Sequence, residues 1–232
     1  MDLRNKRYII NRTLFIIFIL GWFKVFAQDS SAVLGETSVI LIHPISKKYT
    51  ADLTVRSRYF LYDPPSWQLR QQQVDLNLFS NYIIDKKHIV SLGIYYRYRT
   101  LFDTGRSEVR LTEKYNYITY NQKIRYRHKI RTEQRFLEDL TIFRQRYLFE
   151  VGTPLKGDTF DVGETYFTGS IEGLLSLSTE TETITSLRTI AQIEWKLTTT
   201  FKVKTGLEYR LYDFNQEAYS RLFFLTSAVL LL

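Results

Sequence analysis

The chain has 232 residues, 44% of them hydrophobic, with no cysteine and a formal net charge of +8. The absence of cysteine excludes a disulfide framework, a thiolate metal site and a cysteine nucleophile. The length suits a single domain, and no apolar run after Ala27 reaches the roughly 20 residues of a membrane-spanning helix.

The first 27 residues have the three parts of an export signal. A basic start, from Arg4 to Arg12, precedes an apolar run over residues 14–20, and Val25-Phe26-Ala27 supplies small residues for cleavage after Ala27. We therefore expect residues 1–27 to be a signal peptide and residues 28–232 to form one domain.

Removal of this signal halves the net charge. Of the 32 basic and 24 acidic residues, five and one respectively lie in the signal, so the remaining chain carries +4. No compact Lys/Arg tail or patch is left, which argues against a nucleic-acid partner.

Segments with a period of two residues, separated by short polar turns, fill nearly the whole chain after Gly35. Eleven such segments are predicted to be strands: Glu36–Ile42, Tyr49–Leu61, Trp67–Tyr82, His88–Thr100, Arg110–Tyr120, Lys123–Phe136, Ile142–Val151, Phe167–Leu177, Ile184–Leu197, Phe201–Tyr212 and Tyr219–Leu232. Single-chain bacterial barrels usually have an even number of strands, so we expect ten to twelve.

The alternation is clearest between Lys123 and Arg135, where charges occupy nearly every second position. Successive side chains of a strand point to opposite faces, so the charges share one face and the apolar residues share the other. A membrane barrel places the apolar face toward lipid and the polar face toward the lumen.

Many of the segments reach twelve residues, longer than typical sandwich strands and sufficient for a tilted strand to cross a membrane. Tyrosines near strand ends, where an interfacial girdle would lie, support this interpretation: Tyr59, Tyr96, Tyr98, Tyr209, Tyr212 and Tyr219. The predicted fold is an all-β, antiparallel transmembrane β-barrel.

Arginines and carboxylates of mixed sign share the polar face, as expected if they pair across strands in a confined lumen. The predicted lumen-facing charged network consists of Arg125, Arg127, Arg131, Glu133, Arg135, Arg144, Arg146, Glu150, Glu172, Arg188, Glu208 and Arg210. Such a network has two interpretations, a structural filling of a small barrel and a narrow path that favours anions.

Two arginine-rich strings resemble a known family. They are His128-Lys-Ile-Arg131-Thr-Glu133-Gln-Arg135-Phe136 and Phe143-Arg144-Gln-Arg146-Tyr147, with Gln71-Gln-Gln73-Val74-Asp75 upstream and Ile171-Glu172-Gly173 and Arg188 downstream. In this order they resemble domain-of-unknown-function family 2490 of Gram-negative, Bacteroidetes-type bacteria. The resemblance implies an outer-membrane β-barrel over most of the mature chain and brings no catalytic residue with it.

Catalytic and metal-binding patterns give little support to an enzyme. His43, His88 and His128 have no serine placed for a nucleophilic triad. The carboxylates Glu113, Glu133, Glu150 and Glu172 could converge in the lumen, where pairing with arginine explains them better than acid–base work. We therefore expect no catalytic residue, no metal site and no cofactor.

The sequence thus predicts an exported outer-membrane barrel that is not an enzyme, with a role in envelope structure or in the limited passage of small anionic solutes. Its expected partners are outer-membrane lipid and the barrel-assembly machinery. Two alternatives remain: a soluble periplasmic β-protein that binds an apolar ligand, and a barrel-embedded lipid hydrolase.

Overall fold

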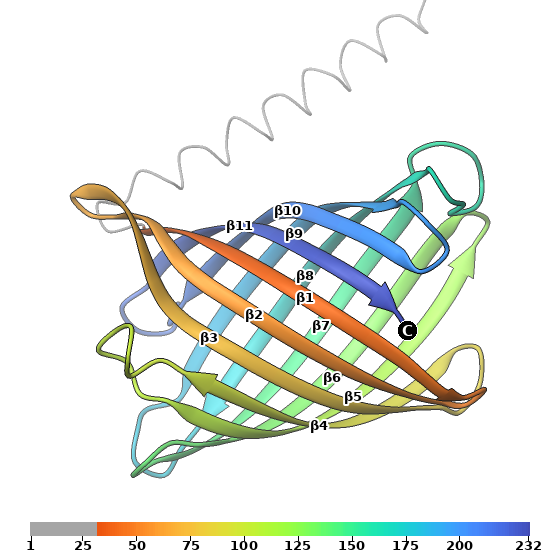
Figure 1. Cartoon of the computed structure of the whole chain (residues 1–232). Helices are drawn as coiled ribbons and strands as arrows, with labels where there is room; N and C mark the ends of the chain where they lie inside the picture. The colour runs from red at the N-terminus through yellow and green to blue at the C-terminus, as the bar shows by residue number, and fades with distance from the viewer. Residues whose placement is uncertain (1–31) are drawn as a thin grey trace, which may run out of the picture.

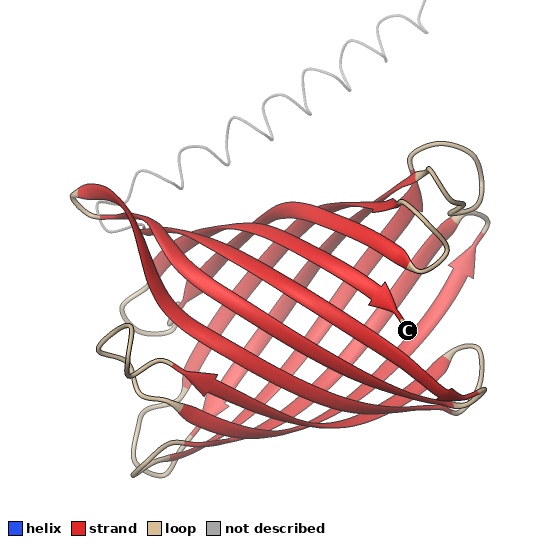
Figure 2. Cartoon of the chain, in the orientation of Figure 1, coloured by secondary structure: helices blue, strands red, loops and turns tan. Residues whose placement is uncertain are grey.

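The computed structural model describes residues 32–232, so the expected signal peptide and its cleavage site lie outside the described residues. The described chain folds into eleven strands that close into one barrel (Figure 1, Figure 2). The strands are β1 (Ala32–Ser46), β2 (Tyr49–Asp63), β3 (Ser66–Ile83), β4 (His88–Tyr98), β5 (Glu108–Asn121), β6 (Ile124–Phe136), β7 (Thr141–Pro154), β8 (Thr165–Leu177), β9 (Ile184–Lys196), β10 (Phe201–Tyr212) and β11 (Tyr219–Leu231). No helix of residues 32–232 has the length and apolar character needed to cross a membrane.

The barrel closes through one parallel pair of strands. Every strand pairs antiparallel with its neighbour in sequence, whereas β1 and β11 pair parallel from Ala32↔Arg221 to Ile42↔Leu231. Figure 1 shows these two strands, one orange-red and one blue, running side by side. An odd number of alternating strands makes the first and last run in the same direction. The eleven predicted segments are confirmed and their number lies within the expected ten to twelve, although it is odd rather than even.

The first strand is longer than the sequence pattern indicated. It begins at Ala32 and continues through Pro44 to Ser46, beyond the expected bounds Glu36–Ile42. Pairing between β1 and β11 stops at Ile42. The missing N–H of Pro44 therefore costs no ladder hydrogen bond on that side, which is the position where a strand tolerates proline.

The two faces of the barrel wall differ in polarity. Leu53, Leu78, Ile94 and Leu111 are successive register partners across β2 to β5 and share the outer face. Of these, Leu78 and Ile94 are 55% and 58% exposed. Polar and charged residues outnumber apolar ones among the buried side chains of the described chain. The interior is therefore polar and the outer surface apolar, the reverse of a soluble sheet protein.

A single apolar cluster interrupts the polar interior of the described chain. It lies where β1, β2 and β11 meet and consists of Ala32, Leu34, Phe60, Phe223 and Leu225. The guanidinium groups of Arg58 and Arg210 lie over the Phe223 ring, 5.0 and 3.8 Å from its centroid. Cation–π contacts thus join this cluster to the surrounding charges.

A β-bulge on β3 turns an extra side chain inward. The register between β2 and β3 shifts after the Arg58↔Gln73 pair, so that Tyr59 faces Gln71. Gln72 is the extra residue and is only 1% exposed, as is its neighbour Gln73. A bulge re-aims side chains in this way, and both glutamines line the lumen.

Not all of the strand-end tyrosines form an outer girdle. Tyr212 and Tyr219 stack on each other with their ring centroids 4.8 Å apart, and both line the lumen. The girdle interpretation is wrong for these two, because their positions share the inward parity of Arg210 and Arg221. Tyr96 and Tyr98, by contrast, stack along the outward parity of β4.

Candidate functional site in the barrel lumen

The strands enclose a cavity of about 670 Å³ that is lined mainly by polar side chains. All of its charged lining residues lie at inward positions of the alternating strands or at their ends. Sixteen lysines and arginines line it, against six aspartates and glutamates. The surface of this cavity is therefore basic, although Asp75, Glu108, Glu150 and Glu194 also project inward and pair with cations there.

Glu133 on β6 is the centre of the lumen network. Its carboxylate is 3.2 Å from Arg131 Nη1 and 3.2 Å from Arg146 Nη1. Arg110 and Arg144 approach it more loosely, at 3.7 and 3.8 Å. Because the glutamate side chain is only 2% exposed, its charge is compensated almost entirely by these four arginines.

From Glu133 a chain of ion pairs runs across β7, β8 and β9. Arg146 links Glu133 to Glu172 on β8. Arg188 on β9 lies 3.6 Å from Glu172 and 4.0 Å from Glu208 on β10. Each arginine thus bridges carboxylates from two other strands.

The chain then crosses the seam of the barrel. Arg210 on β10 donates to Glu208 at 2.5 Å and lies 3.6 Å from Glu36 on β1. Glu36 in turn pairs with Arg58 and Arg56 on β2, at 2.6 and 3.2 Å. A salt bridge from β10 to β1 therefore spans the seam, in addition to the backbone ladder between β1 and β11.

In the other direction the chain runs from Glu133 toward β3. Arg110 joins Glu133 to Glu108 on β5. Arg97 on β4 then lies 2.9 Å from Glu108 and 3.0 Å from Asp75 on β3. Contacts of 4.0 Å or less thus link ten of the eleven strands in one nearly complete ring, with β11 contributing Phe223 beneath Arg210.

Two smaller charge clusters stand apart from this ring. Glu150 on β7 pairs with Arg125, at 2.9 Å, and with Arg127. Glu194 on β9 pairs with Lys204 and Lys202 of β10, at 2.5 and 3.3 Å. In both clusters one carboxylate serves two cations, which maintains the basic excess of the lumen.

All twelve residues that the sequence singled out take part in an ion pair, and the structure divides them between two groups. Arg125, Arg127 and Glu150 form their own cluster. The other nine belong to the ring or attach to it: Arg131, Glu133, Arg135, Arg144, Arg146, Glu172, Arg188, Glu208 and Arg210. The predicted set of twelve leaves out seven further members of the ring, namely Glu36, Arg56, Arg58, Asp75, Arg97, Glu108 and Arg110. These residues lie on the same face of their strands as neighbouring lumen charges, and the alternation in the sequence could have identified them.

One of the four carboxylates expected to converge in the lumen points outward instead. Glu113 pairs in register with Leu92 and Thr132, both on the outer face of the wall. Thr132 donates a hydrogen bond to Gln145 at 3.0 Å on the same face. The expectation for Glu113 is wrong, since its odd position in β5 is opposite in parity to the inward Thr112 and Lys114.

Two of the histidines lie in aromatic clusters on the outer surface. His88 Nδ1 is 2.6 Å from the Tyr115 hydroxyl, and His128 Nδ1 is 2.8 Å from the Tyr147 hydroxyl. The His128 ring also packs near Phe149, at 5.1 Å between centroids. Both imidazoles therefore contact tyrosine rather than a serine nucleophile. Among residues 32–232, no group of three or more His, Asp or Glu side chains is placed to hold a metal ion.

The fold and this site define the class of the protein, a closed eleven-stranded β-barrel with a basic, ion-paired lumen. The profile of the family described as "Protein of unknown function (DUF2490)" matches residues 37–220, most of the chain. The protein belongs to this family. No curated protein and no solved structure shows significant similarity to it.

Proposed function

We propose that this protein is an outer-membrane β-barrel whose basic lumen admits small anions. The observation that carries the proposal is the composition of the cavity wall, with sixteen cationic and six acidic residues around about 670 Å³. Rings of arginine and lysine are the usual basis of anion preference in pores. The expected signal peptide, residues 1–27, would direct the chain to export.

The outer surface supports a membrane location. Leu78, Leu92 and Ile94 are each more than half exposed at the middle of their strands. Exposed apolar surface costs about 25 cal/mol per Å² in water, and no second layer of the described chain covers it. Each strand has at least 11 residues, enough for a tilted strand to cross a bilayer.

Fractionation tests the location. In the parent bacterium or an expressing Gram-negative host, the protein should stay with the outer-membrane pellet after salt and carbonate washes and dissolve only in detergent. A soluble periplasmic β-protein with an apolar ligand would leave the pellet in either wash. Release by carbonate would therefore refute the proposal.

Conductance in planar bilayers tests the passage of anions. Under a KCl gradient the reversal potential should favour chloride, and Arg131→Ala should move it toward potassium because Arg131 lines the cavity. Arg106→Ala, which removes an exposed loop arginine, should leave the preference unchanged. Conductance without anion preference, or a closed barrel, would overturn this part of the proposal.

A second candidate role, in envelope structure alone, is favoured by the ring of ion pairs. Contacts such as Arg146 with Glu133 and Glu172 fill the lumen with side chains that hold neighbouring strands together. Small barrels are often filled in this manner. A protein with no conductance whose deletion weakens the cell envelope would fit this role.

A further inference from the structure

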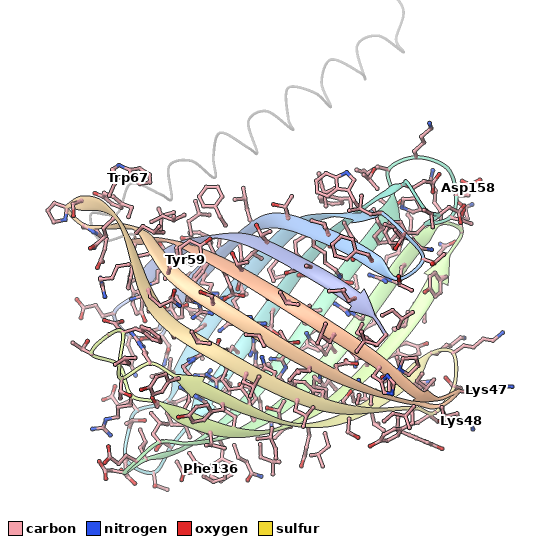
Figure 3. All side chains as sticks on the ribbon, viewed as in Figure 1. Lys47, Lys48, Tyr59, Trp67, Phe136 and Asp158 are labelled. Carbon is pink, nitrogen blue, oxygen red and sulfur yellow. The ribbon has the colours of Figure 1, made fainter. Side chains whose placement is uncertain are left out.

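A smaller cavity of about 320 Å³ lies in the lumen near one rim of the barrel. This rim, here called the lysine rim, carries the turns that contain Lys47, Lys48, Lys87 and Lys123. Lys47 and Lys48 project from the right-hand end in Figure 3, whereas Trp67 marks the opposite rim. The cavity lies just inside these turns, at the ends of β1 to β6.

Four cations and one carboxylate line this cavity: Lys114 of β5, Arg127, Lys129 and Arg131 of β6, and Asp52 of β2. Lys114 and Arg131 are direct cross-strand partners, so their positive charges lie on adjacent strands at the same level. In the ring, by contrast, neighbouring arginines such as Arg131 and Arg146 share a carboxylate. In this cavity the four cations outnumber the single carboxylate, Asp52.

The two lysines are the unbalanced charges. Arg127 pairs with Glu150, and Arg131 Nη1 lies 3.2 Å from Glu133. Within residues 32–232, neither Lys114 nor Lys129 has a carboxylate within 4.0 Å. Like charges in a confined, poorly hydrated space are costly unless a counter-charge lies between them.

An aromatic ring holds Lys114 in place. Its ammonium lies 3.2 Å from the centroid of the Phe79 ring, a close cation–π contact. Phe79 reaches across β4 at Gly93, where a Cβ atom would approach the ring to 2.2 Å. The contact fixes the position of the ammonium but gives it no negative charge, so a bound anion could serve as its partner.

Neutral polar groups complete the lining. Thr50, Asn81, Ser91 and Asn116 face the same cavity, and the Asn81 amide donates to Thr50 Oγ1 at 3.1 Å. Hydroxyl and amide groups supply hydrogen-bond donors beside the cations. At about 30 Å³ per water molecule, the cavity has room for an oxyanion with part of its hydration shell.

We propose that this cavity, the lysine-rim pocket, binds a phosphate group between Lys114 and Lys129. The inference deepens the proposed function and rests on it in one respect, that the lumen is open to water. With a proton on each amine, Lys114 and Lys129 match the charge of a phosphate dianion, and the guanidinium groups of Arg127 and Arg131 add forked donors suited to its oxygens. Asp52 opposes binding and limits its affinity.

Equilibrium dialysis of the full mature chain in a non-ionic detergent, with radiolabelled inorganic phosphate, tests the proposal. Saturable binding of about one phosphate per chain is expected. The double variant Lys114→Gln, Lys129→Gln should weaken it by roughly tenfold or more, because hydrogen bonds to charged groups are among the stronger ones. The matched control Lys47→Gln, Lys48→Gln removes two lysines from an exposed turn and should bind as the parent does.

A variant expected to strengthen phosphate binding provides a second test in case the double variant does not fold. Asp52→Asn removes the opposing charge and should strengthen phosphate binding several-fold. The proposal is overturned by absence of saturable binding to the parent chain, by equal loss in the control pair, or by an Asp52→Asn variant that binds no better. Barrel integrity is checked in each variant by its shift in electrophoretic mobility on heating.

Two further measurements distinguish a free phosphate solute from a lipid headgroup, and phosphate binding from the passage of anions. A free solute predicts that inorganic phosphate competes fully with a water-soluble phosphate monoester. Binding to phospholipid vesicles that Lys114→Gln, Lys129→Gln weakens, without any binding of free phosphate, would overturn the solute proposal in favour of a lipid headgroup. Because dialysis needs neither bilayer nor conductance, phosphate binding by a non-conducting barrel would remove the passage proposal and leave this one standing.

Discussion

Leu34 on β1 and Phe223 on β11 are register partners across the parallel seam, and neither side chain is exposed to solvent (0% each). They form the centre of the apolar cluster inside the barrel. Three kinds of contact therefore hold the seam: the backbone ladder of β1 with β11, this apolar contact, and the ion pair of Glu36 on β1 with Arg210 on β10, which spans β11. Closure is the step of folding that depends on residues farthest apart in sequence.

Phe223→Ala should weaken the seam. Truncation of a buried phenylalanine removes its contacts and leaves a cavity, at a cost of about 3–5 kcal/mol. We expect a lower midpoint of urea unfolding in lipid vesicles, followed by tryptophan fluorescence. Phe224→Ala is the matched control, since Phe224 is 49% exposed on the outer face. An equal loss of stability in both variants would show that the seam cluster contributes no more to stability than an exposed phenylalanine does.

Glu133→Gln should destabilise the lumen network. The change keeps the shape of the side chain but leaves Arg110, Arg131, Arg144 and Arg146 without their shared negative charge. Removal of one partner from a buried charge pair costs about 3–5 kcal/mol. The free energy of unfolding of the refolded protein measures this loss.

An exposed ion pair provides the comparison. Arg106 and Asp139 lie 3.6 Å apart with side chains 55% and 75% exposed, and such pairs contribute about 0–1 kcal/mol. Asp139→Asn should therefore change the unfolding free energy little. If Glu133→Gln is as mild as Asp139→Asn, the ring of ion pairs does not stabilise the barrel.

Ile94→Arg distinguishes lipid from water as the solvent of the outer face. Ile94 is 58% exposed at the middle of β4. An arginine at the lipid-facing midplane of a barrel costs about 2–4 kcal/mol, whereas a soluble protein would tolerate it at such an exposed site. Stability in vesicles and yield in the outer membrane should both fall.

Leu69→Arg is the control for the lipid prediction. Leu69 is 81% exposed and lies near the start of β3, close to the rim that Trp67 marks. The cost of a charge falls toward the edges of the bilayer. Equal tolerance of both substitutions in vesicles would contradict a membrane-embedded outer face.

Asp85 should give the β3–β4 turn a pH dependence of known sign. The N–H groups of Lys87 and His88 donate to Asp85 Oδ1 at 2.7 and 2.8 Å. These hydrogen bonds hold the pKa of Asp85 below its ordinary value of 3.8, and the bond from Lys87 has the larger effect. A depressed folded-state pKa means that the contribution to stability is present above the unfolded pKa and is lost as pH falls through the folded pKa.

The amide resonances of Lys87 and His88, followed by NMR in detergent, measure this titration. The midpoint of their movement should lie below pH 3.8. Asp85→Asn retains an accepting oxygen without a titrating proton, so its two amides should not move over the same range. A midpoint at or above pH 3.8 in the parent chain would show that the turn bonds do not favour the carboxylate.

The alternation between Lys123 and Arg135 shows what local pattern can determine. Because side chains of a strand alternate between two faces, the sequence alone assigned Arg131 and Glu133 to one face and Ile130 to the other, and the number of segments followed from the same periodicity. Glu113 marks the limit of this reasoning, since charge suggested the lumen while its parity with Tyr115 placed it outside.

The sequence by itself determined the strands, their two unlike faces and the family. Only the tertiary structure decided that β1 and β11 close the barrel in parallel, that Glu36 meets Arg210 across that seam, and that no carboxylate of residues 32–232 lies within 4.0 Å of Lys114 or Lys129. The physical reason is that periodicity is a property of consecutive residues. Which charges lie within 4 Å depends on the register of strands brought together from opposite ends of the chain.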